Sequence, residues 1–179
     1  MSKLFETDYT FKGLHAAIVT NLTSEIDSET KFKIFERNLD VFILAPIIGY
    51  LYGRMSVKDE KNSTDNVKKI NFQQLHLESQ ILNYNYSLIM ILHDKDKLPI
   101  KERLDRAFRY TESDAAKQEC NRIYEGYVLG GIEILKEKIL DNASTVDDYI
   151  NNMYNFIEEY NDRYNTVVED NDELLNYIQ

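Results

Sequence analysis

Apolar residues recur every three or four positions along most of the chain, and seldom at every second position. That spacing places them on one face of a helix and predicts an all-α protein. The chain holds six glycines and two prolines in 179 residues, so few positions can break a long helix. We expect residues 1–179 to form a single domain, a bundle of about six helices with two buried central helices.

Capping residues divide this pattern into separate helices. Asn71 with Gln74, and Thr145 with Asp148, have the spacing of capping boxes, and Pro99 suits the first turn of a helix. The helices are expected at residues 10–22, 28–53, 71–93, 99–110, 113–140 and 145–169, with a polar, mobile loop at 56–69 and a tail at 170–179.

Two pairs of glycines lie four residues apart inside the two most apolar of these helices, Gly49 with Gly53 and Gly126 with Gly130. A glycine inside a helix costs about 1 kcal/mol relative to alanine. Such pairs indicate backbones that approach another element closely, so we expect the two helices to cross at these residues. Alternatively, each pair makes room for a nearby tyrosine. Pro46 should kink or restart the first of the two helices.

The helix at 113–140 is apolar on two faces, which is typical of a helix in the middle of a bundle. The last helix instead repeats apolar residues in alternating steps of four and three, the seam of a heptad repeat. This seam should lie along another helix, which belongs either to the same bundle or to another molecule. Its proposed interaction residues are Ile150, Met153, Ile157, Tyr160 and Tyr164.

Charge and composition narrow the possible partners. The formal net charge of −10 repels phosphates, so direct nucleic-acid binding is not expected. The longest apolar run, residues 41–52, is shorter than the roughly twenty residues of a membrane span. One cysteine, Cys120, and an N-terminus without a secretory signal favour the cytoplasm. We expect protein partners, a second copy of the chain among them, and no cofactor.

A short basic helix is a candidate anion-binding site. Arg103, Arg106 and Arg109 follow one another at steps of three and lie roughly on one side of the helix expected at 99–110. Guanidinium groups in such a row could hold a phosphate or a carboxylate. The alternative is that the arginines pair with acidic residues of the same chain.

The apolar stretch 88–92 is followed by His93, Asp94 and Lys95. This pattern resembles the signature of HD-domain phosphohydrolases, an all-α family in which a His-Asp pair ligates a divalent metal. The resemblance implies, as an alternative function, a metal-dependent phosphohydrolase that uses His93 and Asp94. The same residues also suit an ordinary helix C-terminus, where a histidine and lysines interact favourably with the helix dipole.

Three stretches, residues 42–54, 103–109 and 127–133, are similar to small uncharacterised helical proteins of bacterial phage-defence and DNA-modification gene clusters. This resemblance implies an accessory subunit of a larger defence complex, and it transfers no site residue. The favoured function is a non-enzymatic adaptor or regulatory subunit that acts through protein contacts. A third hypothesis is nucleic-acid mimicry or inhibition by the acidic residues of the last helix, Glu158, Glu159, Asp162 and Glu169.

Overall fold

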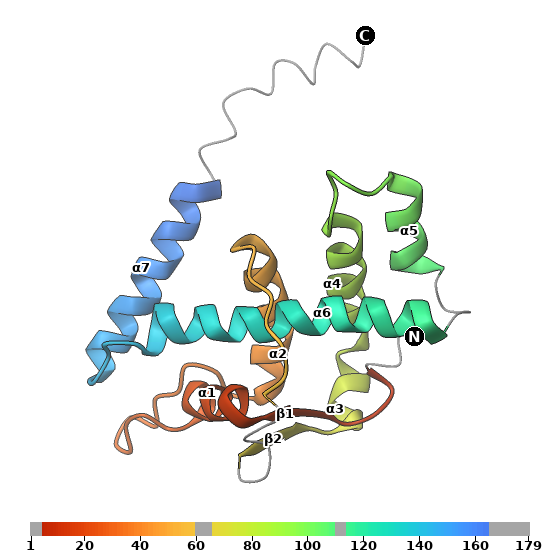
Figure 1. Ribbon diagram of the computed structural model, residues 1–179. Helices are drawn as coiled ribbons and strands as arrows, with labels where there is room; N and C mark the ends of the chain where they lie inside the picture. The colour runs from red at the N-terminus through yellow and green to blue at the C-terminus, as the bar shows by residue number, and fades with distance from the viewer. Residues whose placement is uncertain (1–4, 60–65, 110–113, 165–179) are drawn as a thin grey trace. The chain divides into compact units, whose positions relative to one another are not determined.

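The computed structural model describes residues 5–59, 66–109 and 114–164, and it is built mainly from helices (Figure 1). The prediction of an all-α fold is confirmed. The chain divides into two compact units, Met1–Glu137 and Lys138–Gln179. The elements are β1 (Tyr9–Lys12), α1 (Gly13–Thr23), α2 (Asn38–Leu51), β2 (Val67–Ile70), α3 (Phe72–Leu77), α4 (Ser79–Leu92), α5 (Ile100–Phe108), α6 (Asp114–Leu135), a π-helical turn (Lys136–Leu140) and α7 (Val146–Tyr164).

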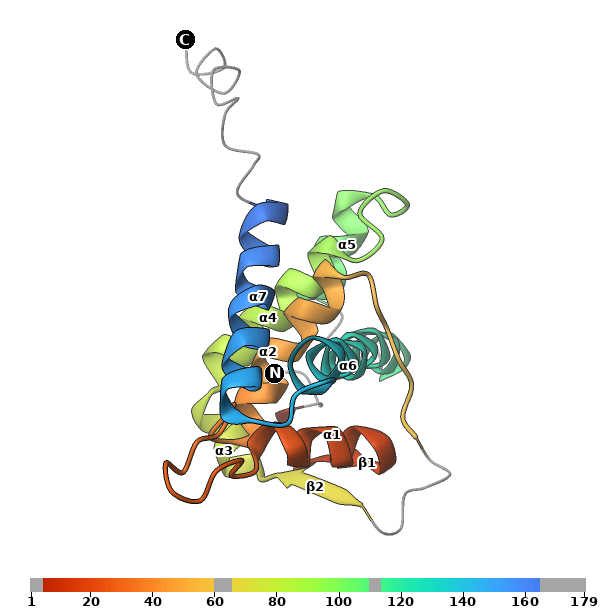
Figure 2. The ribbon, with the colours of Figure 1, turned by 90° about the vertical axis from the view of Figure 1, so that its left-hand side faces the viewer.

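The structure contains a two-stranded antiparallel sheet that the sequence pattern did not predict. β1 pairs with β2 from Tyr9 opposite Ile70 to Lys12 opposite Val67, and the sheet lies beside α1 (Figure 2). Tyr9 and Phe11 are buried, which is the alternation of a strand rather than a helix. The helix expected from residue 10 therefore starts at Gly13, and the last part of the expected loop 56–69 is strand β2.

The helix expected from residue 28 begins ten residues later, at Asn38. A local turn replaces its first part, because the Asp27 carboxylate accepts a hydrogen bond from the Thr30 backbone amide at 2.7 Å. Lys31 then takes a left-handed conformation with φ of 56°, which a helix does not allow. Aspartate competes in this way with helical hydrogen bonding, and the periodic apolar residues alone do not show it.

Helix α2 continues through Pro46, where the sequence predicted a kink or a restart. Proline donates no backbone hydrogen bond and crowds the carbonyl groups of the preceding turn. The side chain of Asn85, buried on α4, donates to the carbonyl oxygen of Ile43 at 2.9 Å. A neighbouring helix thus supplies a donor where Pro46 disturbs the ladder.

Helices α2 and α6 cross with their backbones in close contact, and this packing is the most extensive between any two described elements (Figures 1 and 2). A Cβ atom added to Gly131 would collide with the carbonyl oxygen of Ala45, and one added to Gly49 would collide with that of Tyr127. Gly131 was not singled out from the sequence. The absence of side chains at these two positions is what permits the crossing.

The other three glycines of the expected pairs have different surroundings. A Cβ at Gly130 would collide with the carbonyl oxygen of Arg54, in the chain that leaves α2, and a Cβ at Gly126 would meet the Met55 side chain at 2.7 Å. Gly53 takes no part in the crossing. It follows the end of α2 with φ of 63°, and nothing lies within 4 Å of its missing Cβ. Its left-handed conformation ends the helix, which is a common use of glycine.

Aromatic residues of four elements meet in the core of unit Met1–Glu137. Phe42 on α2 contacts rings from the N-terminal segment, from β1 and from α6, mostly edge to face. The members of this cluster are Phe5, Tyr9, Phe11, Phe42, Tyr86 and Tyr124. The sheet is therefore part of the core, since it contributes two of the six rings.

The predicted capping boxes are present at both positions. The Asn71 amide donates to the Gln74 side chain at 3.3 Å, but the helix that begins there is interrupted at Glu78 and forms α3 and α4. In unit Lys138–Gln179, the Thr145 amide donates to the Asp148 carboxylate at 2.8 Å, and the Asp148 amide donates to the Thr145 hydroxyl at 3.2 Å. The capping box thus sets the start of α7.

Candidate functional site

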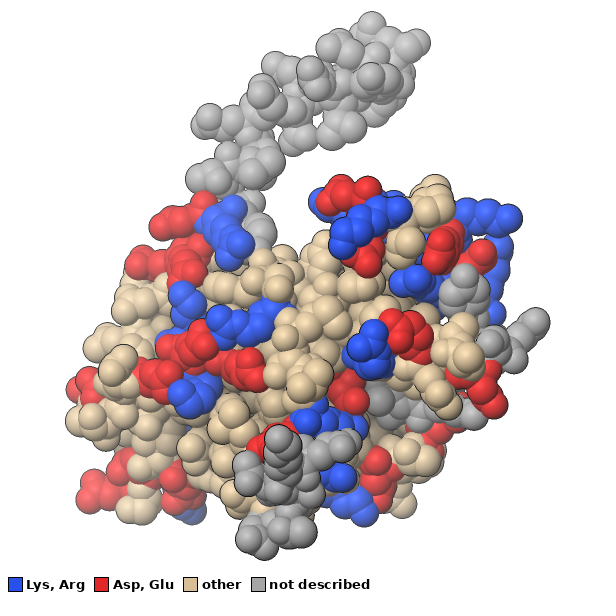
Figure 3. Space-filling model, in the orientation of Figure 1, with Lys and Arg blue, Asp and Glu red and all other residues tan. Residues whose placement is uncertain are grey.

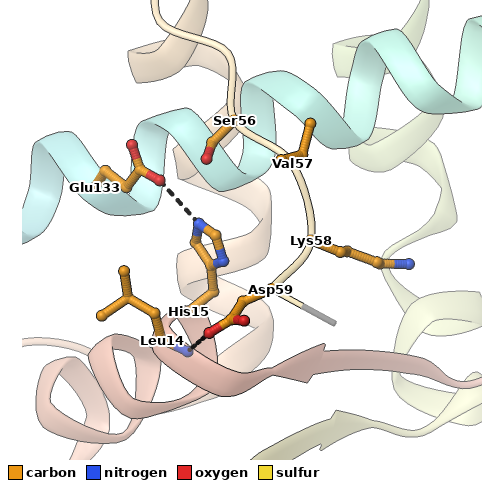
Figure 4. A pocket seen from close by; sticks show the side chains of 7 residues that line it. All are labelled: Leu14, His15, Ser56, Val57, Lys58, Asp59 and Glu133. Atoms are coloured by element: carbon orange, nitrogen blue, oxygen red, sulfur yellow. Dashed lines mark hydrogen bonds and ion pairs between the residues drawn. The ribbon is translucent and has the colours of Figure 1, made fainter. Parts of the chain in front are cut away.

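A hollow with a volume of about 630 Å³ lies between α1, α6 and the segment that follows α2 (Figure 4). Its lining residues are Leu14, His15, Ser56, Val57, Lys58, Asp59 and Glu133. The position of Ser56 is fixed by a hydrogen bond from its amide to the Gly126 carbonyl oxygen at 2.9 Å. None of the lining residues was proposed from the sequence.

The polar side chains of this hollow mostly bind one another or the surrounding frame. Nε2 of His15 donates to the Glu133 carboxylate at 3.1 Å, and Asp59 accepts from the Leu14 amide at 3.2 Å (Figure 4). Lys58 forms an ion pair with Glu125 at 2.6 Å. Nδ1 of His15 is buried and has no hydrogen-bond partner within the part of the chain that the structure describes. The arrangement ties three elements together.

His93 and Asp94 lie at the C-terminal end of α4, and both nitrogens of the imidazole have neighbours. Nδ1 lies 3.0 Å from the Tyr127 hydroxyl, and Nε2 lies 3.3 Å from the Asp94 carboxylate. Burial lowers the pKa of His93, although the Asp94 charge opposes this effect. Lys97 binds Asp94 at 2.9 Å and lowers the pKa of that carboxyl group. Within the described ranges, no three His, Cys, Asp or Glu side chains form a group suited to a metal ion.

The three arginines of the expected anion site are all engaged with the protein itself. Arg103 donates to the carbonyl oxygens of Ile91, at 2.6 Å, and Leu98, at 3.2 Å. Arg106 pairs with Glu102 at 3.0 Å, and Arg109 pairs with Asp105 at 3.1 Å. Each of the last two pairs lies on the helix surface at a spacing of four residues. Arg103 therefore fastens α5 to the preceding chain, whereas Arg106 and Arg109 pair with acidic residues of α5 itself. Figure 3 shows acidic and basic side chains interspersed where α5 lies.

Helix α5 exposes a row of apolar side chains, here called the α5 row: Ile100, Leu104 and Phe108. These residues follow one another at steps of four, so they share one face, and they are 39–60% exposed. No residue of α5 is buried. The i, i+4, i+8 spacing of this row is visible in the sequence, although the row was not predicted from it.

Helix α7 carries a second exposed row, here called the α7 row: Ile150, Tyr154, Ile157 and Tyr160. These side chains are 46–60% exposed, and none of the described side chains of α7 is buried. Three of them belong to the seam proposed from the sequence, while Tyr154 was not included. Met153 is half-buried, and the side chain of Tyr164 lies outside the described residues.

Two polar side chains of α7 contact the start of its own unit. Asn152 donates to the carbonyl oxygen of Ile139 at 3.0 Å, and Glu159 forms an ion pair with Lys138 at 2.5 Å. Glu158 accepts a hydrogen bond from the Tyr154 hydroxyl at 2.6 Å. Of the acidic residues proposed for nucleic-acid mimicry, Glu159 is thus paired within the unit, and Glu169 lies outside the described residues.

Compared with protein-family models, curated proteins and solved structures, the chain matches none. In the described part of the chain, no helix combines the length and the apolar character needed to cross a membrane.

Proposed function

We propose that the protein is a non-enzymatic helical adaptor or regulatory subunit that binds another protein through the α7 row. The observation that carries the proposal is the exposure of four large apolar side chains on one face of a helix without buried residues in its described part. Rows of this kind are more typical of binding surfaces than of ordinary protein surface, where apolar residues are scattered.

The chemistry of the row suits a helical partner. Two isoleucines and two tyrosines provide large apolar area, and tyrosine combines this area with a polar end that can stay hydrated. Burying an exposed isoleucine contributes about 1.5 kcal/mol or more. Asp147 lies three residues before Ile150, and Glu158 lies four residues after Tyr154, so both carboxylates flank the row. The expected partner surface is an apolar groove or helix face with basic residues along one edge.

Capture of partners from the native host with the full-length chain tests this proposal. We compare the wild type with Ile157→Glu, which places a charge in the row, and with Asn155→Glu, which places the same charge on another face of α7. The captured protein is then purified and titrated against all three chains by calorimetry. We expect Ile157→Glu to weaken binding at least about tenfold and Asn155→Glu to leave it within about twofold of the wild type. Equal binding by the two variants would exclude the α7 row.

Because three stretches of the chain resemble small helical proteins of phage-defence gene clusters, we extend the proposal to an accessory subunit of a bacterial phage-defence complex. Under this extension, the captured protein is encoded next to this chain in the host genome, and deletion of the chain sensitises the host to phage infection. A captured partner from an unrelated locus, together with unchanged phage sensitivity, would remove the defence assignment and leave the adaptor function in place.

A further inference from the structure

The α5 row and the α7 row are similar in length and chemistry. From Ile100 to Phe108 the α5 row spans eight residues, about 12 Å along the helix, and from Ile150 to Tyr160 the α7 row spans ten, about 15 Å. Both consist of exposed aliphatic and aromatic side chains at helical spacing. Two such rows can pack against each other as ridges along a helix pair.

The two helices that carry the rows have net charges of opposite sign. Lys101 lies three residues before Leu104 and forms no ion pair with any residue that the structure describes. The α7 row is flanked by Asp147 and Glu158. Over their full lengths, α5 carries three basic and two acidic residues, whereas α7 carries one basic and five acidic residues. An α7–α7 contact would bring acidic flanks together, whereas an α5–α7 contact pairs opposite charges.

The α5 row is also held rigidly before any partner binds. Arg103 fastens α5 to the carbonyl oxygens of Ile91 and Leu98, and the Ser87 hydroxyl on α4 donates to the Ala107 carbonyl oxygen at 3.3 Å. A docking surface that is already ordered loses little conformational freedom on binding. This anchoring distinguishes α5 from a helix end that frays in solution.

We propose that the α7 row of one copy docks on the α5 row of a second copy, so that the chain associates with itself head to tail. The inference rests on the proposed function, because it names a partner for the same α7 surface. A contact between two different faces leaves one α5 row and one α7 row unused in a dimer, so growth continues until a ring closes. A binding partner for α7 would compete with this assembly and reduce it.

Mixing two variants tests the inference. Ile157→Glu removes the α7 row and keeps the α5 row, whereas Phe108→Glu does the reverse, and both residues are exposed. We expect the wild type to associate at about 100 μM in sedimentation experiments. Each variant alone should self-associate with an affinity at least about tenfold weaker. An equimolar mixture restores one intact contact, so a dimer forms and no larger species appears. Asn155→Glu is the charge-matched control and should assemble like the wild type.

A charge exchange provides a second test that does not alter the apolar rows. Lys101→Glu and Glu158→Lys should each weaken association about two- to fivefold, and the double variant should recover most of the loss. A strictly monomeric wild type overturns the inference, and so does a mixture that stays monomeric. Neither result affects the proposed function, since that depends on whether Ile157→Glu loses the captured partner. An assembly that Ile157→Glu abolishes and Phe108→Glu leaves intact also overturns it, because α5 would then not be the acceptor.

Discussion

Helix α6 buries twelve of its 22 residues, whereas none of the described side chains of α7 is buried. Both helices are rich in isoleucine and tyrosine, so composition alone does not separate them. The difference lies in the distribution of these residues. In α6 they occur on two faces together with three glycines, and in α7 they occur on one broad face opposite acidic and amide residues. Two apolar faces predict an inner helix, and one predicts a helix at an edge.

The largest expected effect comes from placing a methyl group in the α2–α6 crossing. Gly131→Ala drives a Cβ into the Ala45 carbonyl oxygen, and backbone cannot move aside as a flexible side chain can. We expect a loss of about 3 kcal/mol or more in the free energy of unfolding, measured with urea. Gly53→Asn is the control, because that position is open and asparagine tolerates a left-handed backbone. Equal stability of the two variants would contradict the close crossing.

A smaller effect is expected where α5 is fastened to α4. Arg103→Ala removes two hydrogen bonds from a charged group to the carbonyl oxygens of Ile91 and Leu98. The expected loss is about 1.5–3 kcal/mol in the free energy of unfolding. Arg109→Ala removes a pair with Asp105 in which the arginine is largely exposed, and it should cost less than about 1 kcal/mol. If both variants lose the same free energy of unfolding, Arg103 does not anchor α5, and the α5 row is not ordered before a partner binds.

Replacing two tyrosines of α6 by phenylalanine should change the free energy of unfolding in opposite directions. The Tyr124 hydroxyl is buried without a hydrogen-bond partner among the described residues, and its burial raises its pKa. Tyr124→Phe should therefore increase the free energy of unfolding by up to about 1 kcal/mol. Tyr127→Phe removes the contact with Nδ1 of His93 and should decrease it by about the same amount. Thermal unfolding of both variants at neutral pH measures the two signs, and a loss of stability in Tyr124→Phe would reveal a partner for that hydroxyl.

The smallest effect on stability is expected at the α7 row, where the effect on binding is largest. Ile157→Glu replaces a side chain that is 60% exposed, so its free energy of unfolding should stay within about 0.5 kcal/mol of the wild type. The free energy of unfolding of Asn155→Glu should also stay within about 0.5 kcal/mol of the wild type. A destabilisation of several kcal/mol by Ile157→Glu alone would show that the row is part of the core and would remove the basis of the adaptor proposal.

The long helices and their caps could be predicted from the sequence, because capping and periodicity act within a few residues of one another. The boxes at Asn71 and Thr145 and the two-faced helix α6 are examples. The strands could not be predicted from the sequence. The four residues of β1 are too few for alternating apolar and polar positions to identify a strand, and β1 pairs with β2 across about sixty residues of chain. The turn at Asp27 was not predicted either, because hydrogen bonds from Thr30 to the Asp27 side chain form it where the apolar repeat indicated a helix.

The candidate sites could be predicted only in part. Heptad spacing located Ile150, Ile157 and Tyr160 but gave no information on which of them are exposed. The row of arginines suggested an anion site, whereas Arg103 reaches backbone carbonyl groups that no sequence pattern identifies. The pairing of His15 with Glu133 joins α1 to α6, and residues so far apart in the chain carry no local signal of their contact.

The contrast between a buried α6 and an exposed α7 row can be measured most directly with thiol labelling. The chain has one cysteine, Cys120, which is buried on α6, and Ile157→Cys adds a second thiol in the α7 row. At a concentration below self-association, the variant should react in two phases, a fast phase from residue 157 and one at least about 100-fold slower from Cys120. Two slow phases would place the α7 row inside the fold and contradict the account.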